Sequence, residues 1–263
     1  MNEQLLYVLE IWHVCVIFFV GILFFAYIGY KTGKVFRKKN ESQKSGFDEI
    51  MTGIITVLSL LIGFTFSMSG ERYQSYKNMM IDEVNCISSA VLNSDLYPEP
   101  YRSEFRKYFS EYIEARIDFN NAGTNLIKIN DSKKKSDIAG KNLWEISSRL
   151  FRDSVLINAS RQMSPNLTKM FGAATTREAR LRSKVPSLIL LMIVITTLLA
   201  VYISGFRSIQ IRKRELLYIL SFTVVITLVT YIILDLDRPD SGLIKPSIEH
   251  EAMIELRQNF FNE

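Results

Sequence analysis

Apolar residues are concentrated in four blocks of the sequence, and polar residues fill the segments between them. The blocks are residues 5–30, 50–69, 185–206 and 216–234, which we call spans 1 to 4. Each is close to the roughly 20 residues that a helix needs to cross about 30 Å of hydrocarbon. The pattern therefore predicts an all-α integral membrane protein with four transmembrane helices. The residues at the start of span 1, MNEQLL, include Glu3 but no Lys or Arg, and no small-residue cleavage site follows Tyr30, so we expect span 1 to be retained.

The long segment between spans 2 and 3, residues 70–184, is polar, but its apolar residues recur at helical spacing. No proline separates span 2 from this segment, so one helix is expected to continue from the membrane into it. Pro98 and Pro100 predict the end of that helix and the start of another, which runs to about residue 121.

The second half of this segment reads as loop and then helix. Residues 120–137 are rich in Asn, Ser and Lys and predict a loop. An apolar stripe predicts a helix over 138–155, and Ser164-Pro165 is a plausible cap and first turn for a last helix over 166–184. We therefore expect a helical bundle inserted between spans 2 and 3.

The expected domain organisation has four parts. Residues 1–69 hold spans 1 and 2 with a basic loop between them, 70–184 form the extramembrane bundle, 185–234 hold spans 3 and 4, and 235–263 form a tail.

Basic residues crowd the ends of the spans, which accounts for the net charge of +5 without nucleic-acid binding. The two short loops are densest in them: Lys31, Lys34, Arg37, Lys38, Lys39 and Lys44 after span 1, and Arg207, Arg212, Lys213 and Arg214 after span 3. The positive-inside rule places both loops in the cytoplasm and the bundle outside. When the Lys and Arg residues next to all ends of the four spans are counted, however, the difference between the two sides of the membrane nearly vanishes.

Small and polar residues gather on one face of span 2. They recur three or four positions apart: Thr52, Thr56, Ser59, Gly63, Ser67 and Gly70. Such a stripe faces protein or water rather than lipid. It either packs closely against a neighbouring helix through its small residues or lines a pore.

Glu71 and Arg72 follow this stripe directly. In a symmetric oligomer they would form charged rings that concentrate ions. The alternatives are a solvated interfacial face or a salt bridge between helices.

Residues suited to catalysis are scarce. The chain has two His and two Cys, and it contains no Gly-rich phosphate loop, serine-elbow motif or CxxC pair. We therefore expect no enzymatic activity, no cofactor and no metal site.

The residues around span 2 resemble those of a known family. Gly63-Phe64 followed by Glu71-Arg72-Tyr73 is similar to the second span of bestrophins, in which a Gly-Phe pair precedes an acidic-Arg-aromatic group. The order of parts also matches, including the acidic turn LDLDRPDSG after span 4. The whole chain resembles the bestrophin-like membrane proteins of bacteria.

The resemblance implies a homopentameric anion channel with five copies of span 2 around the pore and a constriction that ends at the Phe of the Gly-Phe pair. Carried over, the constriction positions are Thr56, Leu60 and Phe64, and with Thr52 and Ser67 they form the expected pore lining. The chain departs from the family at Thr56, where an apolar residue is usual, and after Tyr73, where a tryptophan is missing. The family also places the bundle in the cytoplasm, against the loop charges.

Three aspartates in the turn after span 4, Asp235, Asp237 and Asp240, resemble the acidic cluster that helps animal bestrophins bind calcium. Their spacing does not fit an EF-hand loop, because Pro239 occupies the third ligand position. A capped turn that keeps carboxylates at the interface is the alternative.

The sequence thus predicts a multi-pass, homo-oligomeric ion channel of the bacterial inner membrane, pentameric by resemblance. Its expected partners are membrane lipid, further copies of the chain and small ions, with no nucleic acid. The alternative is a non-conducting sensor or scaffold whose bundle binds a partner.

Overall fold

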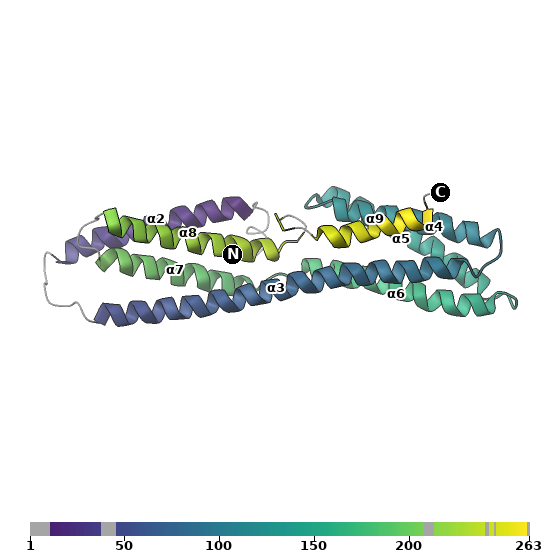
Figure 1. Cartoon of the computed structure of the whole chain (residues 1–263), viewed down its shortest axis with the longest axis horizontal. Helices are drawn as coiled ribbons and strands as arrows, with labels where there is room; N and C mark the ends of the chain where they lie inside the picture. The colour runs from purple at the N-terminus through teal and green to yellow at the C-terminus, as the bar shows by residue number, and fades with distance from the viewer. Residues whose placement is uncertain (1–10, 38–45, 208–212, 240–241, 245, 262–263) are drawn as a thin grey trace. The chain divides into compact units, whose positions relative to one another are not determined.

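The computed structural model describes residues 11–37, 46–207, 213–239, 242–244 and 246–261. Within these ranges every regular element is an α-helix, which confirms the predicted all-α class (Figure 1). The helices are α2 (Ile11–Arg37), α3 (Gly46–Ser94), α4 (Tyr101–Asn121), α5 (Leu126–Leu150), α6 (Ile157–Arg182), α7 (Ser187–Arg207), α8 (Lys213–Leu236) and α9 (Ser247–Phe261). Four of them, α2, α3, α7 and α8, are long and apolar enough to cross a membrane.

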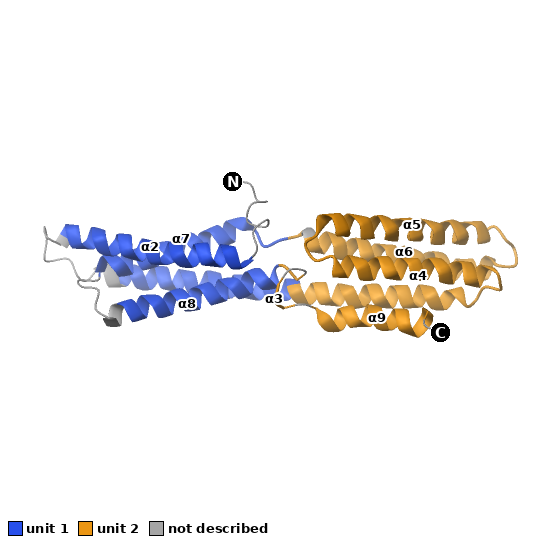
Figure 2. Cartoon of the chain, turned by 90° about the horizontal axis from the view of Figure 1, so that it is seen from above, with its two compact units in different colours: residues 1–72, 184–237 blue, residues 73–183, 238–263 orange. Residues whose placement is uncertain are grey.

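The chain divides into two compact units (Figure 2). Unit 1 comprises residues 1–72 and 184–237, and unit 2 comprises residues 73–183 and 238–263. Helix α3 contributes to both units, as the absence of proline after span 2 predicted. Unit 1 also contains α2, α7 and α8, whereas α4, α5, α6 and α9 belong to unit 2.

In unit 1, α2 and α7 approach each other closely at glycines. A Cβ atom added to Gly29 would overlap the backbone carbonyl of Tyr202, and one added to Gly33 would overlap that of Phe206. Gly205 of α7 meets the backbone of α2 in the same way. Because Gly29 and Gly33 are four residues apart, they lie on one face of α2 and let the two backbones come together.

The apolar core of unit 1 draws on all four of its helices. Its buried residues are Phe18, Ile22 and Ala26 from α2, Leu58 from α3, Ile193 and Val201 from α7, and Ile226 from α8. Helix α3 contributes to this core only Leu58 and the partly buried Leu61 and Ile62, which form a narrow strip along the helix.

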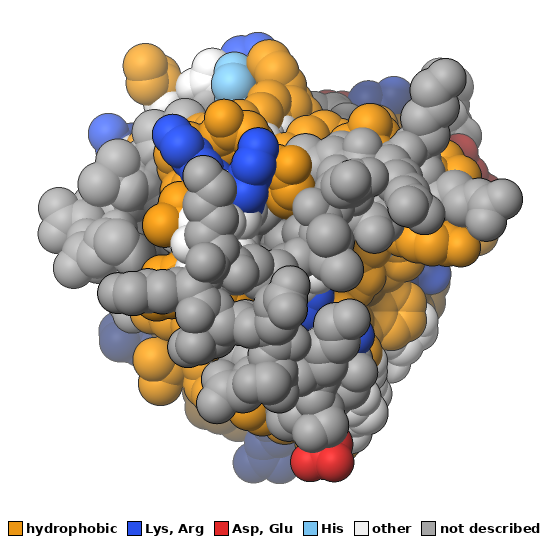
Figure 3. Space-filling model, turned by 90° about the vertical axis from the view of Figure 1, so that its left-hand side faces the viewer, with side chains coloured by type: hydrophobic (Ala, Val, Ile, Leu, Met, Phe, Trp, Pro, Cys, Tyr) orange, Lys and Arg blue, Asp and Glu red, His pale blue; other side chains and the backbone are white. Residues whose placement is uncertain are grey.

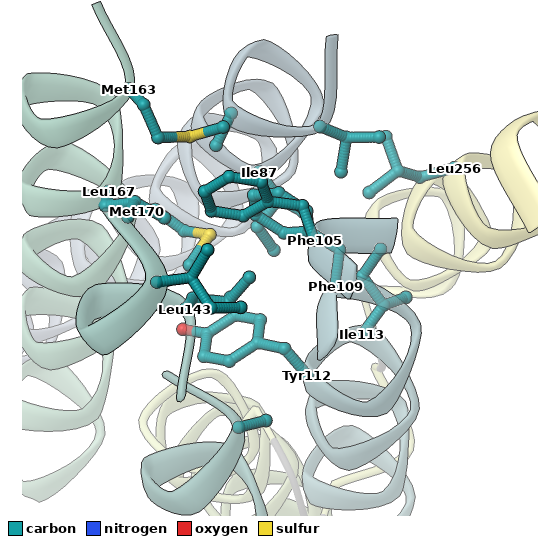
Figure 4. Packing of buried hydrophobic residues seen from close by; sticks show 14 of the residues in the cluster. Ile87, Phe105, Phe109, Tyr112, Ile113, Leu143, Met163, Leu167, Met170 and Leu256 are labelled. Carbon is teal, nitrogen blue, oxygen red and sulfur yellow. The ribbon is translucent and has the colours of Figure 1, made fainter. Parts of the chain in front are cut away.

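Unit 2 is a helical bundle with a larger core, shown in Figure 4. Aromatic rings of α4, among them Phe105, Phe109 and Tyr112, point into it from one side. They meet Ile87 of α3, Leu143 of α5, Met163, Leu167 and Met170 of α6, and Leu256 of α9. The last of these helices comes from the C-terminal residues, so the bundle is not built from the inserted segment alone.

The loop predicted over residues 120–137 is wrong, because α5 already begins at Leu126. The Asn125 side chain caps this helix by accepting hydrogen bonds from the backbone N–H groups of Ile127 and Lys128. As far as Gly140, the buried face of α5 consists of small residues such as Ser132 and Ser136, and large apolar residues begin only at Leu143. A helix with such a face looks like a loop when judged by its composition.

The predicted start of the last bundle helix at residue 166 is also wrong. Helix α6 begins at Ile157 and contains Pro165 in its interior. Its buried face, with Ser160, Met163 and Leu167, runs past the proline without a break. Packing of this face outweighs the single backbone hydrogen bond that a proline removes.

Candidate functional site

The face of α3 that the sequence singled out is exposed within unit 1. Thr52, Thr56 and Ser67 are exposed, and so are the two large residues, Leu60 at 57% and Phe64 at 67%. The opposite face of the same helix carries the buried residues Leu58, Thr65 and Ser69. All five predicted pore-lining residues therefore share one uncovered face of a helix long and apolar enough to span a membrane.

Hydroxyl groups along this face bond to the backbone of their own helix. Thr56 donates from Oγ1 to the carbonyl oxygen of Thr52 at 2.8 Å, and Ser59 donates from Oγ to that of Ile55 at 2.8 Å. Each hydroxyl keeps an oxygen lone pair directed away from the backbone. These hydroxyl groups therefore have a hydrogen-bond acceptor without water, and their oxygen atoms can still interact with an ion or a water molecule.

The glycines of α3 show that this face is not used for close packing inside unit 1. A Cβ atom added to Gly53, Gly63 or Gly70 would meet nothing within 4 Å. This contrasts with the tight contacts of Gly29 and Gly33 in α2. The close helix contact that the sequence suggested for span 2 therefore occurs in unit 1 between α2 and α7 instead.

Arg72, at the end of unit 1's part of α3, forms a salt bridge with the acidic turn after α8. Its Nε lies 3.2 Å from Oδ1 of Asp237, whose side chain is only 1% exposed. Asp237 also accepts the backbone N–H of Val185, at 3.1 and 3.2 Å to its two oxygens. One carboxylate thus joins α3, the segment before α7 and the end of α8.

Asp237 experiences opposing influences on its ionisation. Burial raises its pKa, while Arg72, the Val185 N–H and Lys184 act in the lowering direction. The net result is a raised pKa, because the loss of hydration on burial outweighs the favourable interactions of the carboxylate with its partners.

The other predicted charged residues have different surroundings. Glu71 is exposed, whereas Asp235 is buried and Asp240 lies outside the described residues. Among the residues that the structure describes, no three His, Cys, Asp or Glu side chains gather in an arrangement that could hold a metal ion.

Sequence reasoning missed a buried charge network in unit 2. Arg116 of α4 lies 2.5 Å from Glu83 of α3 and 2.9 Å from Glu178 of α6. Arg177 lies 2.8 Å from Glu83, and Lys133 of α5 lies 2.7 Å from Glu178. Glu83, Arg116 and Arg177 have at most 1% of their side chains exposed. These ion pairs connect four helices of unit 2: α3, α4, α5 and α6.

Further contacts surround the two arginines. Arg177 donates from Nη2 to Oδ1 of Asn120 at 2.7 Å, and the Arg116 guanidinium lies 4.7 Å from the ring centre of Phe119. Burial acts to raise the pKa of Glu178, but Lys133 and Arg116 outweigh it and the pKa is lowered. One signal of this network was present in the sequence, because Arg116 falls on the apolar face of α4.

Comparison with known proteins gives two matches. A family model described as the bestrophin-like domain matches residues 15–247. The fold is similar to a crystal structure of a bacterial bestrophin homologue from Klebsiella pneumoniae that carries a mutation, with a TM-score of 0.67 and 11% sequence identity. That match covers 96% of this chain and 99% of the other. A search of curated proteins gives no match.

Proposed function

The chain belongs to the bestrophin-like family, as the residues around Gly63 predicted, and from this premise we propose that it is a multi-pass membrane protein that forms an ion channel. Helices α2, α3, α7 and α8 cross the bilayer, which in the bacterial host is the inner membrane. Several copies of the chain, five by family resemblance, surround a pore lined by α3. Unit 2 lies outside the bilayer.

The observation that carries this proposal is the uncovered face of α3. Thr52, Thr56, Leu60, Phe64 and Ser67 lie along it, and α2, α7 and α8 leave it exposed. In a closed symmetric ring the same face of each copy meets the axis. Hydroxyl oxygens there replace part of the water around an ion, and the larger apolar side chains narrow the passage.

Phe64 is the natural candidate for the narrowest point, and its removal tests the proposal. We expect Phe64→Ala to increase ion flux into liposomes that contain the purified protein, because a smaller side chain widens an apolar constriction. Empty vesicles give the background.

Phe66 provides the matched control. It is also exposed, at 46%, but it lies two residues further along α3 and therefore about 200° around the helix. Phe66→Ala should leave the flux unchanged. Equal increases from both substitutions would mean that the ion path does not follow the Phe64 face, and no flux from any intact oligomer would favour the non-conducting scaffold.

Charge at the end of the pore is supplied by Glu71. Arg72 is engaged by Asp237, whereas Glu71 is exposed beside it and recurs once per copy. A ring of carboxylates attracts cations. Glu71→Gln should therefore lower the permeability ratio of cations to anions, measured from reversal potentials in asymmetric salt.

The side of the membrane that unit 2 occupies is tested with Cys86. The charges of the short loops favour the outside, and family resemblance favours the cytoplasm. In a Cys15→Ser background, Cys86 is the remaining cysteine. Labelling of intact cells by a membrane-impermeant thiol reagent would place unit 2 outside, and labelling only after lysis would place it in the cytoplasm.

A further inference from the structure

Unit 1 contains a partly open groove between three of its helices. The groove has a volume of about 170 Å³, and its lining includes Met51 and Ile55 of α3, Ala200 and Ser204 of α7, and Tyr218 and Phe222 of α8. Ser204 lies three residues before the end of α7, while Met51 and Tyr218 lie five residues after the first residues of α3 and α8. The groove is therefore within about 8 Å of the helix ends that the two short loops join.

The groove opens on a different side of α3 from the proposed pore lining. Met51 and Ile55 immediately precede Thr52 and Thr56, and each residue step turns the helix by about 100°. An occupant of the groove would therefore lie beside the channel wall and outside the ion path.

In a bilayer, lipid acyl chains fill an apolar groove, because the side chains that line an empty groove would lose van der Waals contacts. The volume slightly exceeds that of the roughly 150 Å³ apolar cavity known to accept benzene. It suits one segment of an acyl chain and is too small for a helix. Ser204 and Tyr218 add hydroxyl groups beside the apolar lining.

The sequence on both sides of the two short loops is rich in basic residues. Residues 31–49 and 207–215 together hold ten Lys or Arg and four Asp or Glu. Of these, Lys31, Lys34 and Arg207 are exposed on the last turns of α2 and α7, and Glu49 is exposed on the first turn of α3. Figure 3 shows Lys and Arg side chains next to apolar surface at this end. Such a surface attracts an anionic headgroup.

We propose that this groove binds an anionic phospholipid, with one acyl chain between α3, α7 and α8 and the headgroup attracted by the exposed basic residues Lys31, Lys34 and Arg207. The proposal rests on the membrane insertion proposed above, but it does not depend on conduction. It identifies a lipid site where neither the family match nor the similar structure assigns one.

The test is lipid retention by the purified full-length protein in detergent. The protein is incubated with phosphatidylglycerol or, separately, with phosphatidylcholine, and native mass spectrometry counts the lipid molecules that remain per chain. Ser204→Phe fills the groove. Ser204→Ala keeps it open, and Leu199→Phe adds the same ring at an exposed position of the same helix.

We expect wild type, Ser204→Ala and Leu199→Phe to retain phosphatidylglycerol in preference to phosphatidylcholine. Ser204→Phe should retain about tenfold less, the effect of excluding roughly two buried methylene groups. Equal retention by Ser204→Phe and Leu199→Phe would overturn the site, and equal retention of the two lipids would overturn the role of the basic residues.

Two further outcomes distinguish lipid binding from binding of a second copy of the chain and from ion conduction. If Ser204→Phe splits the oligomer without releasing lipid, another copy of the chain occupies the groove and the proposal is wrong. If the protein retains phosphatidylglycerol through Ser204 but conducts no ions, the lipid site stands and the channel does not. Should Ser204→Phe fail to fold, quenching of Phe222→Trp fluorescence by substoichiometric brominated phosphatidylglycerol decides, with Leu199→Trp as the control expected to stay bright.

Discussion

The two parts of helix α3 differ in how many of their large apolar residues are buried. In unit 1, residues 46–72 expose large apolar side chains such as Leu60 and Phe64 and bury the polar Thr65 and Ser69. In unit 2, residues 73–94 bury a regular apolar stripe that includes Ile87. The more apolar part of the helix is thus the less covered part. In water this would be unfavourable, whereas in a bilayer it is ordinary, so the comparison supports the proposal that residues 46–72 lie in a bilayer.

The comparison also shows which part of α3 is left uncovered by its own chain. In unit 2, α3 contributes Val84, Ile87, Ala90 and Val91 to a core that it shares with α4, α5, α6 and α9. In unit 1, Leu58 is its one fully buried contribution to the main apolar core of the described residues. The uncovered part is the one that carries the predicted pore residues. Substitutions at covered and at uncovered positions should therefore differ in their effect on stability. The following four experiments measure such differences in the two units, from the largest expected effect to the smallest.

Neutralising Glu83 should have the largest effect, because it leaves Arg116 and Arg177 buried without their shared partner. We expect Glu83→Gln to lower the free energy of unfolding of unit 2 by about 3–5 kcal/mol. Chemical unfolding followed by Trp144 fluorescence in a Trp12→Phe background measures it. The neighbouring exposed residue gives the control, since Asp82→Asn should stay within about 0.5 kcal/mol of wild type. Equal losses from both would refute a special role for the network.

Truncating one aliphatic side chain in each part of α3 compares their burial directly. Ile87→Ala should cost about 2–5 kcal/mol, because Ile87 is fully buried in the core of unit 2. Leu60→Ala should cost less than about 1 kcal/mol in the dissociated chain, because Leu60 is exposed there. Helix content monitored during unfolding in detergent gives both values. A larger loss at Leu60 than at Ile87 would reverse the comparison.

Adding one methyl group to a glycine sharpens the contrast inside unit 1. Gly33→Ala should destabilise unit 1 by about 1–3 kcal/mol, because the new Cβ would overlap the backbone carbonyl of Phe206. Gly63→Ala should stabilise the helix by up to about 1 kcal/mol, since nothing lies near the new atom and alanine favours helix. Thermal unfolding in detergent distinguishes the two. The prediction fails if both substitutions shift the midpoint in the same direction.

Acid should weaken unit 2 through Glu178. Its pKa lies below the ordinary 4.5, despite burial, because Lys133 and Arg116 favour the carboxylate. A lowered pKa contributes stability that is present above 4.5 and lost as the pH falls through the folded value. Unfolding midpoints of unit 2 between about pH 6 and pH 3 should therefore fall less steeply for Glu178→Gln than for wild type. Identical slopes would mean that another group dominates the acid response.

Much of the fold was predictable because it depends on properties of single segments. The four apolar blocks, the continuation of span 2 and the start of α4 after Pro100 follow from hydropathy and backbone restrictions. The start of α5 was missed because the first part of its buried face, up to Gly140, consists of small residues. The start of α6 was missed because its packed face continues past Pro165.

The site was predictable only in part. The stripe on α3 and the pair Glu71-Arg72 are visible as patterns within one helix. The salt bridge from Arg72 to Asp237 joins residues 165 positions apart, and the network around Glu83 draws on four helices. No spacing rule links such residues, because their neighbourhood exists only after folding. The glycine pair of α2 is the exception, since its spacing of four was present in the sequence and was overlooked.

The charge network of unit 2 also bears on how relatives of this chain can diverge. Glu83, Arg116 and Glu178 sit within three different helices, so an inserted residue beside any of them rotates the following turn by about 100° and separates a buried charge from its partner. The turns between α3 and α4, α4 and α5, and α5 and α6 contain no member of the network. Relatives can therefore vary in these turns without separating the buried charges, while the charged positions can be exchanged only together.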